Sequence, residues 1–303
     1  MPIDDGEAWL ESAPGRLRNV RMGKYKLSFY VNGTGEQLPN GNLDLVMRRH
    51  SFPVGMRMLT ERMALPSSPE AYQSYLNALS THFWAGTIAK QMVWSNYEPQ
   101  AGSFLAPLAA MRKTLTWMDE HHWVHPAATL FEDEPPNPYH FATHYPCTQL
   151  SNHLNQRLSR DLDTFHGKIR LYEVGLAGLH LHDGGTCGKS IAQLLSDIFR
   201  HAHAADPAAI LCPTAAGVLT GTPTGAASFT RLLHGLQHDK VPLRAICVKA
   251  AFGGAVDATI VKHRLDMLAE VQLPIYIAGS DLAWLDLTRL NSTRLDSTLL
   301  DST

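Results

Sequence analysis

The sequence predicts an α/β fold in which parallel strands alternate with helices, as they do in β/α barrels. Short β-type runs alternate with longer amphipathic runs along most of the chain. The length of 303 residues fits one barrel of about 250 residues as well as it fits two average domains. The composition is 45% hydrophobic with a net charge of -2, which predicts a globular protein and gives no argument for nucleic acid or a membrane as a partner.

Seven runs have the length and composition of strands in a parallel sheet. They lie at 52–58, 84–90, 124–131, 170–178, 208–215, 245–252 and 274–282. Between them lie stretches with helical spacing, at 71–79, 108–118, 150–165, 191–204, 228–236 and 258–271. Upstream, two alternating runs at 24–31 and 42–50 flank residues 33–41 and predict a β-hairpin that leads into the barrel.

A closed barrel of this kind needs eight strands, and the sequence predicts seven. After Asp281 the chain passes into a tail that repeats every five residues, at 288–292, 293–297 and 298–302. A period of five fits neither a strand nor a helix, so no eighth strand is predicted there. The predicted organisation is therefore an extension with a hairpin (1–50), a barrel (51–285) and a low-complexity tail (286–303). A frayed end and a truncated or mis-spliced coding sequence both explain the tail, and we favour the second.

Two further features bear on the compartment. The first seven residues are acidic and lack the apolar core of a secretory signal, so the chain is either intracellular or an internal piece of a longer secreted one. The four cysteines, Cys147, Cys187, Cys212 and Cys247, have neither metal nor redox spacing. Cys212 and Cys247 lie in apolar strand-like runs and are predicted to be buried free thiols.

The segment 83–102 resembles the second-strand segment of glycoside hydrolase family 10, the xylanase family. That segment reads Glu-Asn-x-Met-Lys-Trp and then Glu-Pro-x-x-Gly. The positions that match without a gap are Met92, Trp94, Glu98, Pro99 and Gly102. The sugar-facing positions do not match and are occupied by Ala89, Lys90 and Val93. Segments at 51–55, 170–180 and 274–282 resemble the first, fourth and seventh strands, and the upstream hairpin is similar to a segment that precedes the barrel in some members. The resemblance therefore spans roughly residues 16–282 and implies a TIM-type barrel.

The resemblance also implies a retaining glycosidase site from which the catalytic groups have been lost. The fourth-strand motif Asp-Val-x-Asn-Glu reads Glu173-Val174-Gly175-Leu176-Ala177, so Ala177 replaces the acid/base. Gly279 replaces the nucleophile of the seventh strand. The supporting polar positions of the third, fifth and sixth strands read Ala128, Thr214 and Lys249. Because two carboxyl groups are needed for retention, the resemblance implies a catalytically inactive homologue, and no cofactor is expected.

The remaining cleft positions predict a carbohydrate ligand of the xylan type. Trp94 stands where an aromatic ring stacks on a sugar, although packing accounts for it equally well. The other predicted substrate-binding residues are Lys90, Gln91 and His180.

Three alternatives remain open. In the first, an active hydrolase uses carboxylates at new positions, namely Glu132, Asp133, Glu134, Asp183 and Asp281. In the second, a metal such as zinc is held by His180, His182 and Asp183, with His140 and His144 nearby. In the third, the chain is a non-functional truncated product. A solvated loop is the simpler explanation for Glu132, Asp133 and Glu134, and a structural hydrogen bond is the simpler explanation for Asp281. His180 matches a Leu-His pair that some members of the xylanase family have, which explains it without a metal.

Overall fold

The computed structural model describes residues 55–58, 60, 63, 68–88, 90–131, 145–176, 187–221, 223–250 and 257–278, with 14–15, 28, 30 and 32–37 near the N-terminus. The chain divides into two compact units, Met1–Pro53 with Asp257–Thr259 and Val54–Val256 with Ile260–Thr303. Each unit is described by itself below.

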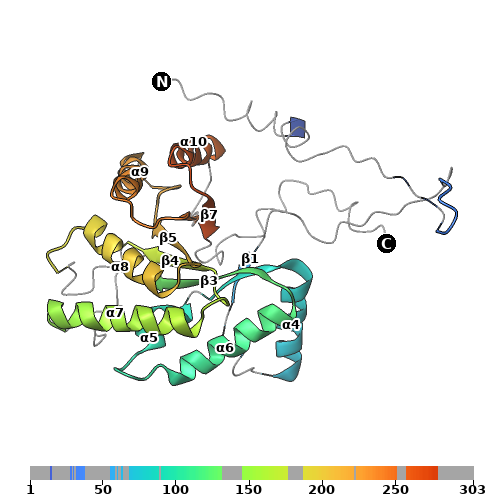
Figure 1. Ribbon diagram of the computed structural model, residues 1–303, viewed down its shortest axis with the longest axis horizontal. Helices are drawn as coiled ribbons and strands as arrows, with labels where there is room; N and C mark the ends of the chain where they lie inside the picture. The colour runs from blue at the N-terminus through green and yellow to red at the C-terminus, as the bar shows by residue number, and fades with distance from the viewer. Residues whose placement is uncertain are drawn as a thin grey trace. The chain divides into compact units, whose positions relative to one another are not determined.

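The larger unit contains one parallel sheet whose strands follow one another in chain order (Figure 1). The strands are β1 Gly55–Arg57, β2 Ala85–Ile88, β3 Val124–Phe131, β4 Leu171–Gly175, β5 Ile210–Ala215, β6 Ile246–Lys249 and β7 Ile275–Ala278. Each hydrogen-bonded pair is parallel. This is the strand order of a β/α barrel, and it confirms the predicted fold class. The described sheet has seven strands, with β1 and β7 at its two edges.

Helices connect successive strands and lie along the outer side of the curled sheet (Figure 1). The long ones are α4 Pro69–His82, α6 Leu105–Glu120, α7 Cys147–Thr164, α8 Ile191–Ala205, α9 Pro223–His238 and α10 Ala258–Ala269. The β2–α6 connection contains two short turns, η1 Lys90–Met92 and α5 Trp94–Tyr97. The start of α8 shows why a helix begins where it does. Gln193 N–H donates to the Ser190 hydroxyl at 3.2 Å, and Ser190 N–H donates to Gln193 Oε1 at 2.8 Å, which satisfies two amides of the first turn.

The two faces of the sheet differ because successive side chains on a strand point to opposite sides. The helix-facing side carries large buried residues, such as Ile88, Leu130, Tyr172, Leu211 and Val248. The inner side carries a separate small cluster of Ala127, Leu171, Cys212, Ala245 and Cys247. Most of the apolar bulk therefore lies between the sheet and the helices, and the inner face is left for smaller and polar side chains.

The cysteines correct one prediction from the sequence. Cys212 and Cys247 are not free thiols but form a disulfide between β5 and β6, with the Cα atoms 5.6 Å apart. The register places Thr214 opposite Cys247, so Cys212 lies two residues earlier on the same face of the neighbouring strand. That placement is within disulfide reach. The other two cysteines form a second disulfide between Cys147, which begins α7, and Cys187, which precedes α8.

The smaller unit contains an antiparallel bridge between Tyr30 and Gln37. The turn between them includes Gly33 and Gly35, whose φ angles of 97° and 69° suit glycine. The chain therefore reverses within 30–37, slightly earlier than the predicted connection at 33–41. The second predicted run, 42–50, lies outside the described residues.

Candidate functional site

Three charged side chains come from different strands to the inner face of the sheet. In the register Arg57 lies opposite Thr87, and Thr129 lies opposite Glu173. Lys249 is two residues beyond Cys247, which belongs to the inner cluster. Each therefore points to the inner side, because residues two apart on a strand share a face.

Glu173 is the most deeply placed of these charges, with 4% of its surface exposed. The Thr129 hydroxyl donates to Glu173 Oε2 over 3.4 Å, a long and weak hydrogen bond. Burial raises the pKa of the Glu173 carboxyl, and the positive charges of Lys249 and Arg57 offset this rise only in part. The carboxyl therefore keeps its proton to a higher pH than an exposed glutamate does.

A buried hydroxyl on the same face lacks a hydrogen-bond partner. Thr214 is 1% exposed, and its Oγ1 contacts no donor or acceptor within the described residues. It lies between Gly175 of β4 and Cys247 of β6 in the register. Buried polar atoms without partners are uncommon in folded proteins.

The segment after β2 forms a second polar cluster, and this cluster accounts for the family-like sequence motif. Trp94 is 4% exposed, and its indole N–H donates to Glu98 Oε2 at 3.2 Å. The Gly102 N–H donates to Glu98 Oε1 at 2.7 Å, and Gly102 has a φ of 81°, which suits glycine. Glu98 therefore closes the connection between α5 and α6, and its motif partners satisfy both carboxylate oxygens.

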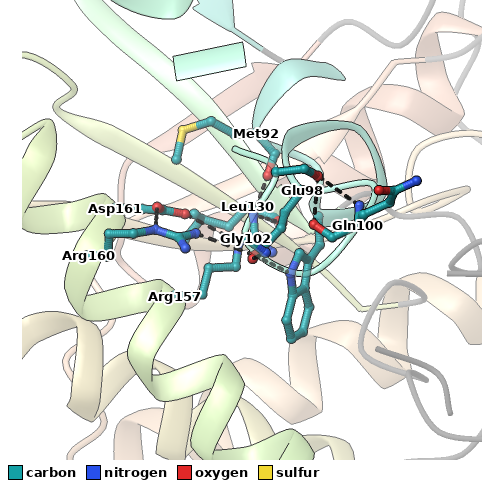
Figure 2. A network of polar contacts seen from close by, with 10 residues as sticks. Met92, Glu98, Gln100, Gly102, Leu130, Arg157, Arg160 and Asp161 are labelled. Carbon is teal, nitrogen blue, oxygen red and sulfur yellow. Dashed lines mark hydrogen bonds and ion pairs between the residues drawn. The ribbon is translucent and has the colours of Figure 1, made fainter. Parts of the chain in front are cut away.

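Helix α7 supplies the other half of this cluster (Figure 2). Arg157 donates to Asp161 Oδ2 at 3.3 Å, to the Met92 carbonyl, and to the Leu130 carbonyl at 3.3 Å. Arg160 donates to Asp161 Oδ1 at 2.9 Å and lies 3.7 Å from Glu98. Burial lowers the pKa of Arg157, and Asp161 opposes that effect. These contacts join α7 to η1, which follows β2, and to β3.

The predicted substrate-binding residues fall into two groups. Trp94 and Gln91 are described, and both are buried at the end of β2. The Arg157 guanidinium lies 5.3 Å from the centroid of the Trp94 ring, which favours packing over sugar stacking for this side chain. The backbone of Lys90 lies in η1. The side chain of Lys90 and the whole of His180 lie outside the described residues.

The predicted catalytic and metal positions also lie outside the described part. They are Ala177, Gly279, His180, His182 and Asp183, with the alternative acids Glu132, Asp133, Glu134 and Asp281 and the nearby His140 and His144. Their roles therefore stay predictions. Within the part that the structure describes, no group of three or more His, Cys, Asp or Glu side chains is placed to hold a metal ion. Among the same residues, no helix is long and apolar enough to span a lipid bilayer.

Sequence reasoning missed the charged inner cluster. It identified Glu173 only as the match to a family aspartate, and it gave Arg57 no role. The available signal was alternation, since Leu171, Glu173 and Gly175 share one face of a strand that is buried throughout. Ala128 differs from expectation as well, because it packs in the helix-facing cluster and its neighbour Thr129 points inward.

A cavity of about 440 Å³ lies near the amino-terminal ends of strands β3 and β4. It is lined by Asp119 near the end of α6, by Val124 at the start of β3, and by Lys168 and Arg170 before β4. Barrel enzymes place their active sites at the carboxyl ends of the strands. A cavity at the amino-terminal ends is therefore not where an active site is expected.

Comparison with known proteins shows the fold. No protein-family model matches the chain, and no curated protein matches it. Solved structures do match. Xylanase 10B from Thermotoga maritima superposes with a TM-score of 0.62 at 17% identity, over 78% of this chain and 74% of that one. Xylanase 10B from Thermotoga petrophila, in complex with xylobiose, gives 0.62 at 16% identity over 80% and 77%.

The intracellular xylanase of Thermoanaerobacterium saccharolyticum gives a TM-score of 0.59 at 17% identity, over 79% of each chain. Across similar xylanases the chain spans between 66% and 79% of their length. Identities this low show the fold and leave activity open. The chain thus has the barrel fold of the family 10 xylanases, as the sequence predicted.

Proposed function

We propose that this chain is a xylanase-like protein of polysaccharide metabolism that binds a carbohydrate without hydrolysing it by the retaining mechanism. The observation that carries the proposal comes from the sequence. At the two positions where the family that this chain resembles has its catalytic carboxyl groups, the chain has Ala177 and Gly279, which can neither donate a proton nor attack a sugar carbon. Retention needs two carboxyl groups about 5–5.5 Å apart.

The other buried carboxylates near the carboxyl ends of β2 and β3 are engaged elsewhere. Glu98 accepts hydrogen bonds from Trp94 and Gly102, and Asp161 is held by two arginines. Neither is available as a nucleophile without breaking the contacts that join α7 to the strands. A xylan-type carbohydrate remains the proposed ligand class, by analogy with a similar xylanase that is solved with xylobiose.

The test is hydrolysis of xylan and of an aryl xyloside by the purified chain, beside an active xylanase of the same fold. We expect no turnover above background, because general acid and nucleophilic catalysis are each worth orders of magnitude in rate. Steady turnover that disappears in Glu173→Gln or Glu132→Gln would replace this proposal with relocated carboxylates. A parallel titration with xylobiose measures binding, and complete absence of binding would refute the carbohydrate ligand.

A further inference from the structure

The cavity near the amino-terminal ends of β3 and β4 lies away from the carboxyl ends of the strands, where a carbohydrate would bind. We propose that this cavity binds a small zwitterion with an apolar body, of the amino-acid class. Its volume of about 440 Å³ lies within the range of pockets that hold small molecules. The lining combines an apolar wall, a carboxylate from one element and two cations from another, and such a ligand has a group to match each of them.

The apolar wall of the cavity is fixed by the core. Leu115 of α6 and Trp123, which precedes β3, line the cavity and are buried. Trp123 packs edge-on against Trp117, with the ring centroids 5.2 Å apart. Val124 lies next to them and has 39% of its surface exposed, so it offers apolar surface to a ligand. An apolar group placed against this wall leaves water, which favours binding.

The carboxylate of the lining belongs to Asp119, in the last turn of α6. The carboxyl end of a helix carries partial negative charge, so an acidic residue there does not stabilise the helix. The Asp119 carboxylate also makes no ion pair and no hydrogen bond to any residue that the structure describes. The helix end and the carboxylate together attract a ligand ammonium group.

The two cations of the lining, Lys168 and Arg170, lie in the connection from α7 to β4. Gly167 has a φ of 72° at the turn after α7, and nothing lies within 4 Å of a methyl group built on it, so the turn leaves the space beside it open. Lys168 and Arg170 are exposed and Ile169 between them is buried, so the two cations point to the same side. Neither side chain pairs with a described residue, Asp119 included. An arginine can bind a carboxylate through two parallel hydrogen bonds, and a lysine adds a second positive charge.

The arrangement of these charges favours a zwitterion over a simple ion. A simple anion is attracted by Lys168 and Arg170 and repelled by Asp119, and a simple cation meets the opposite forces. A zwitterion is attracted at both of its ends and is thereby oriented across the apolar wall. Because the three charged side chains are exposed, each attraction is screened by water and contributes modestly.

The experiment uses the full chain and three probes that share a phenyl ring. Phenylalanine carries both charges, 3-phenylpropionate lacks the amine, and 2-phenylethylamine lacks the carboxylate. Saturation-transfer NMR of the ring protons at about pH 7, where amines and carboxylates are both ionised, gives the three dissociation constants. Phenylalanine should bind saturably and about threefold to fivefold more tightly than either partner probe, as expected for one additional exposed ion pair.

Two variants assign the ends of the ligand. Asp119→Asn should weaken the binding of phenylalanine and 2-phenylethylamine and spare 3-phenylpropionate. Arg170→Met should weaken phenylalanine and 3-phenylpropionate and spare 2-phenylethylamine. Both side chains are exposed, so we expect both variants to fold. Lys262→Met, at an exposed lysine of α10 outside the cavity, is the matched control and should leave all three affinities unchanged.

Several results would overturn the site. They are absence of saturable phenylalanine binding, equal affinities for the three probes, and losses in the two variants that do not depend on which charge the probe carries. An excess of xylobiose should leave phenylalanine bound, and displacement would place the probe elsewhere. The proposed function is tested by xylan turnover and xylobiose binding, so it and this inference can fail separately.

Discussion

Arg157 joins helix α7 to two segments that are distant in the sequence. It is a buried cation on α7 whose donors reach Asp161 and the carbonyl oxygens of Met92 and Leu130. Replacement by Met keeps the length of the side chain and removes the charge. We expect Arg157→Met to lower the free energy of unfolding by about 3 kcal/mol or more, since it removes a buried donor to the Met92 and Leu130 carbonyls and one of the two arginines that hold the buried Asp161 carboxylate. Urea denaturation of the purified variant measures this loss.

The matched control is Lys262→Met on α10. Lys262 also forms an i,i+4 ion pair, with Asp266, but both side chains are about half exposed. Solvent-exposed pairs contribute little, so the control should change stability by no more than about 1 kcal/mol. Equal losses in the two variants would show that burial of the Arg157 pair has no special weight.

At the level of single residues, the sequence predicted part of the polar cluster that follows β2. The matching positions Trp94, Glu98 and Gly102 were identified from the motif, and all three belong to one cluster in the structure. The motif could not show that the cluster is completed by Arg157, because the arginine and the Met92 carbonyl are 65 residues apart. Glu173 was hidden for a related reason, since its partners come from strands β1, β3 and β6.

Two glycine-to-alanine substitutions test how individual elements are packed. The first tests the packing of β2 against the end of α6. A methyl group added at Gly86 of β2 would lie 2.7 Å from Trp123 Cζ3 and 3.0 Å from Met118 Cε. Trp123 is itself buried in edge contact with Trp117, so the ring has little room to move. Gly86→Ala should therefore destabilise the protein by about 1–3 kcal/mol, as overpacked core substitutions do.

Gly235, within α9, provides the opposite case. Nothing lies within 4 Å of a methyl group built there, and the residue is exposed on a helix. Gly235→Ala should stabilise the protein by about 0.5–1 kcal/mol, because alanine loses less backbone entropy in a helix. Thermal unfolding of the two variants should give shifts of opposite sign. A rise in midpoint for Gly86→Ala would contradict the close approach of β2 to α6.

The elements themselves were largely predictable, and their ends were not. Alternation and helical spacing predicted the seven strands and their helices in the right order, because those patterns record which face is buried. The strand predicted at 170–178 is observed as Leu171–Gly175, and the helix predicted from residue 228 begins at Pro223. Proline is well tolerated in a first helical turn, so Pro223 is compatible with the observed start of that helix.

For the whole molecule, the two disulfides should differ in their resistance to reduction. Cys212 and Cys247 are buried on the inner face, whereas Cys147 and Cys187 are partly exposed. Thiol–disulfide exchange needs access to a sulfur atom, so a mild reductant should open the Cys147–Cys187 bond first. Alkylation under native conditions followed by mass spectrometry measures the order. Labelling of all four cysteines without reductant would show that neither bond forms.

This pairing could not be read from the sequence, because four cysteines allow three connectivities and their spacing has no signature. The register of β5 and β6 in the structure brings Cys212 and Cys247 together. Disulfides persist mainly in oxidising compartments, so we expect both bonds to form when the chain folds in one and to be absent from chain made in a reducing cytosol. Counting free thiols in protein from the two sources would decide this.

The open edges of the described sheet predict that the protein associates with itself. Strands β1 and β7 each have one hydrogen-bonded neighbour in that sheet, and edge backbone of this kind pairs readily with another chain. Ile277 of β7 has 53% of its surface exposed, although its register partner Val248 is fully buried. We expect the protein to self-associate at micromolar concentration and Ile277→Lys to shift it toward the monomer, because a charged edge residue opposes strand pairing. Leu105→Lys is the control, since Leu105 is 70% exposed on α6, away from both edges. Sedimentation velocity of the three proteins measures the effect, and a wild type that is already monomeric would show that the edges are protected.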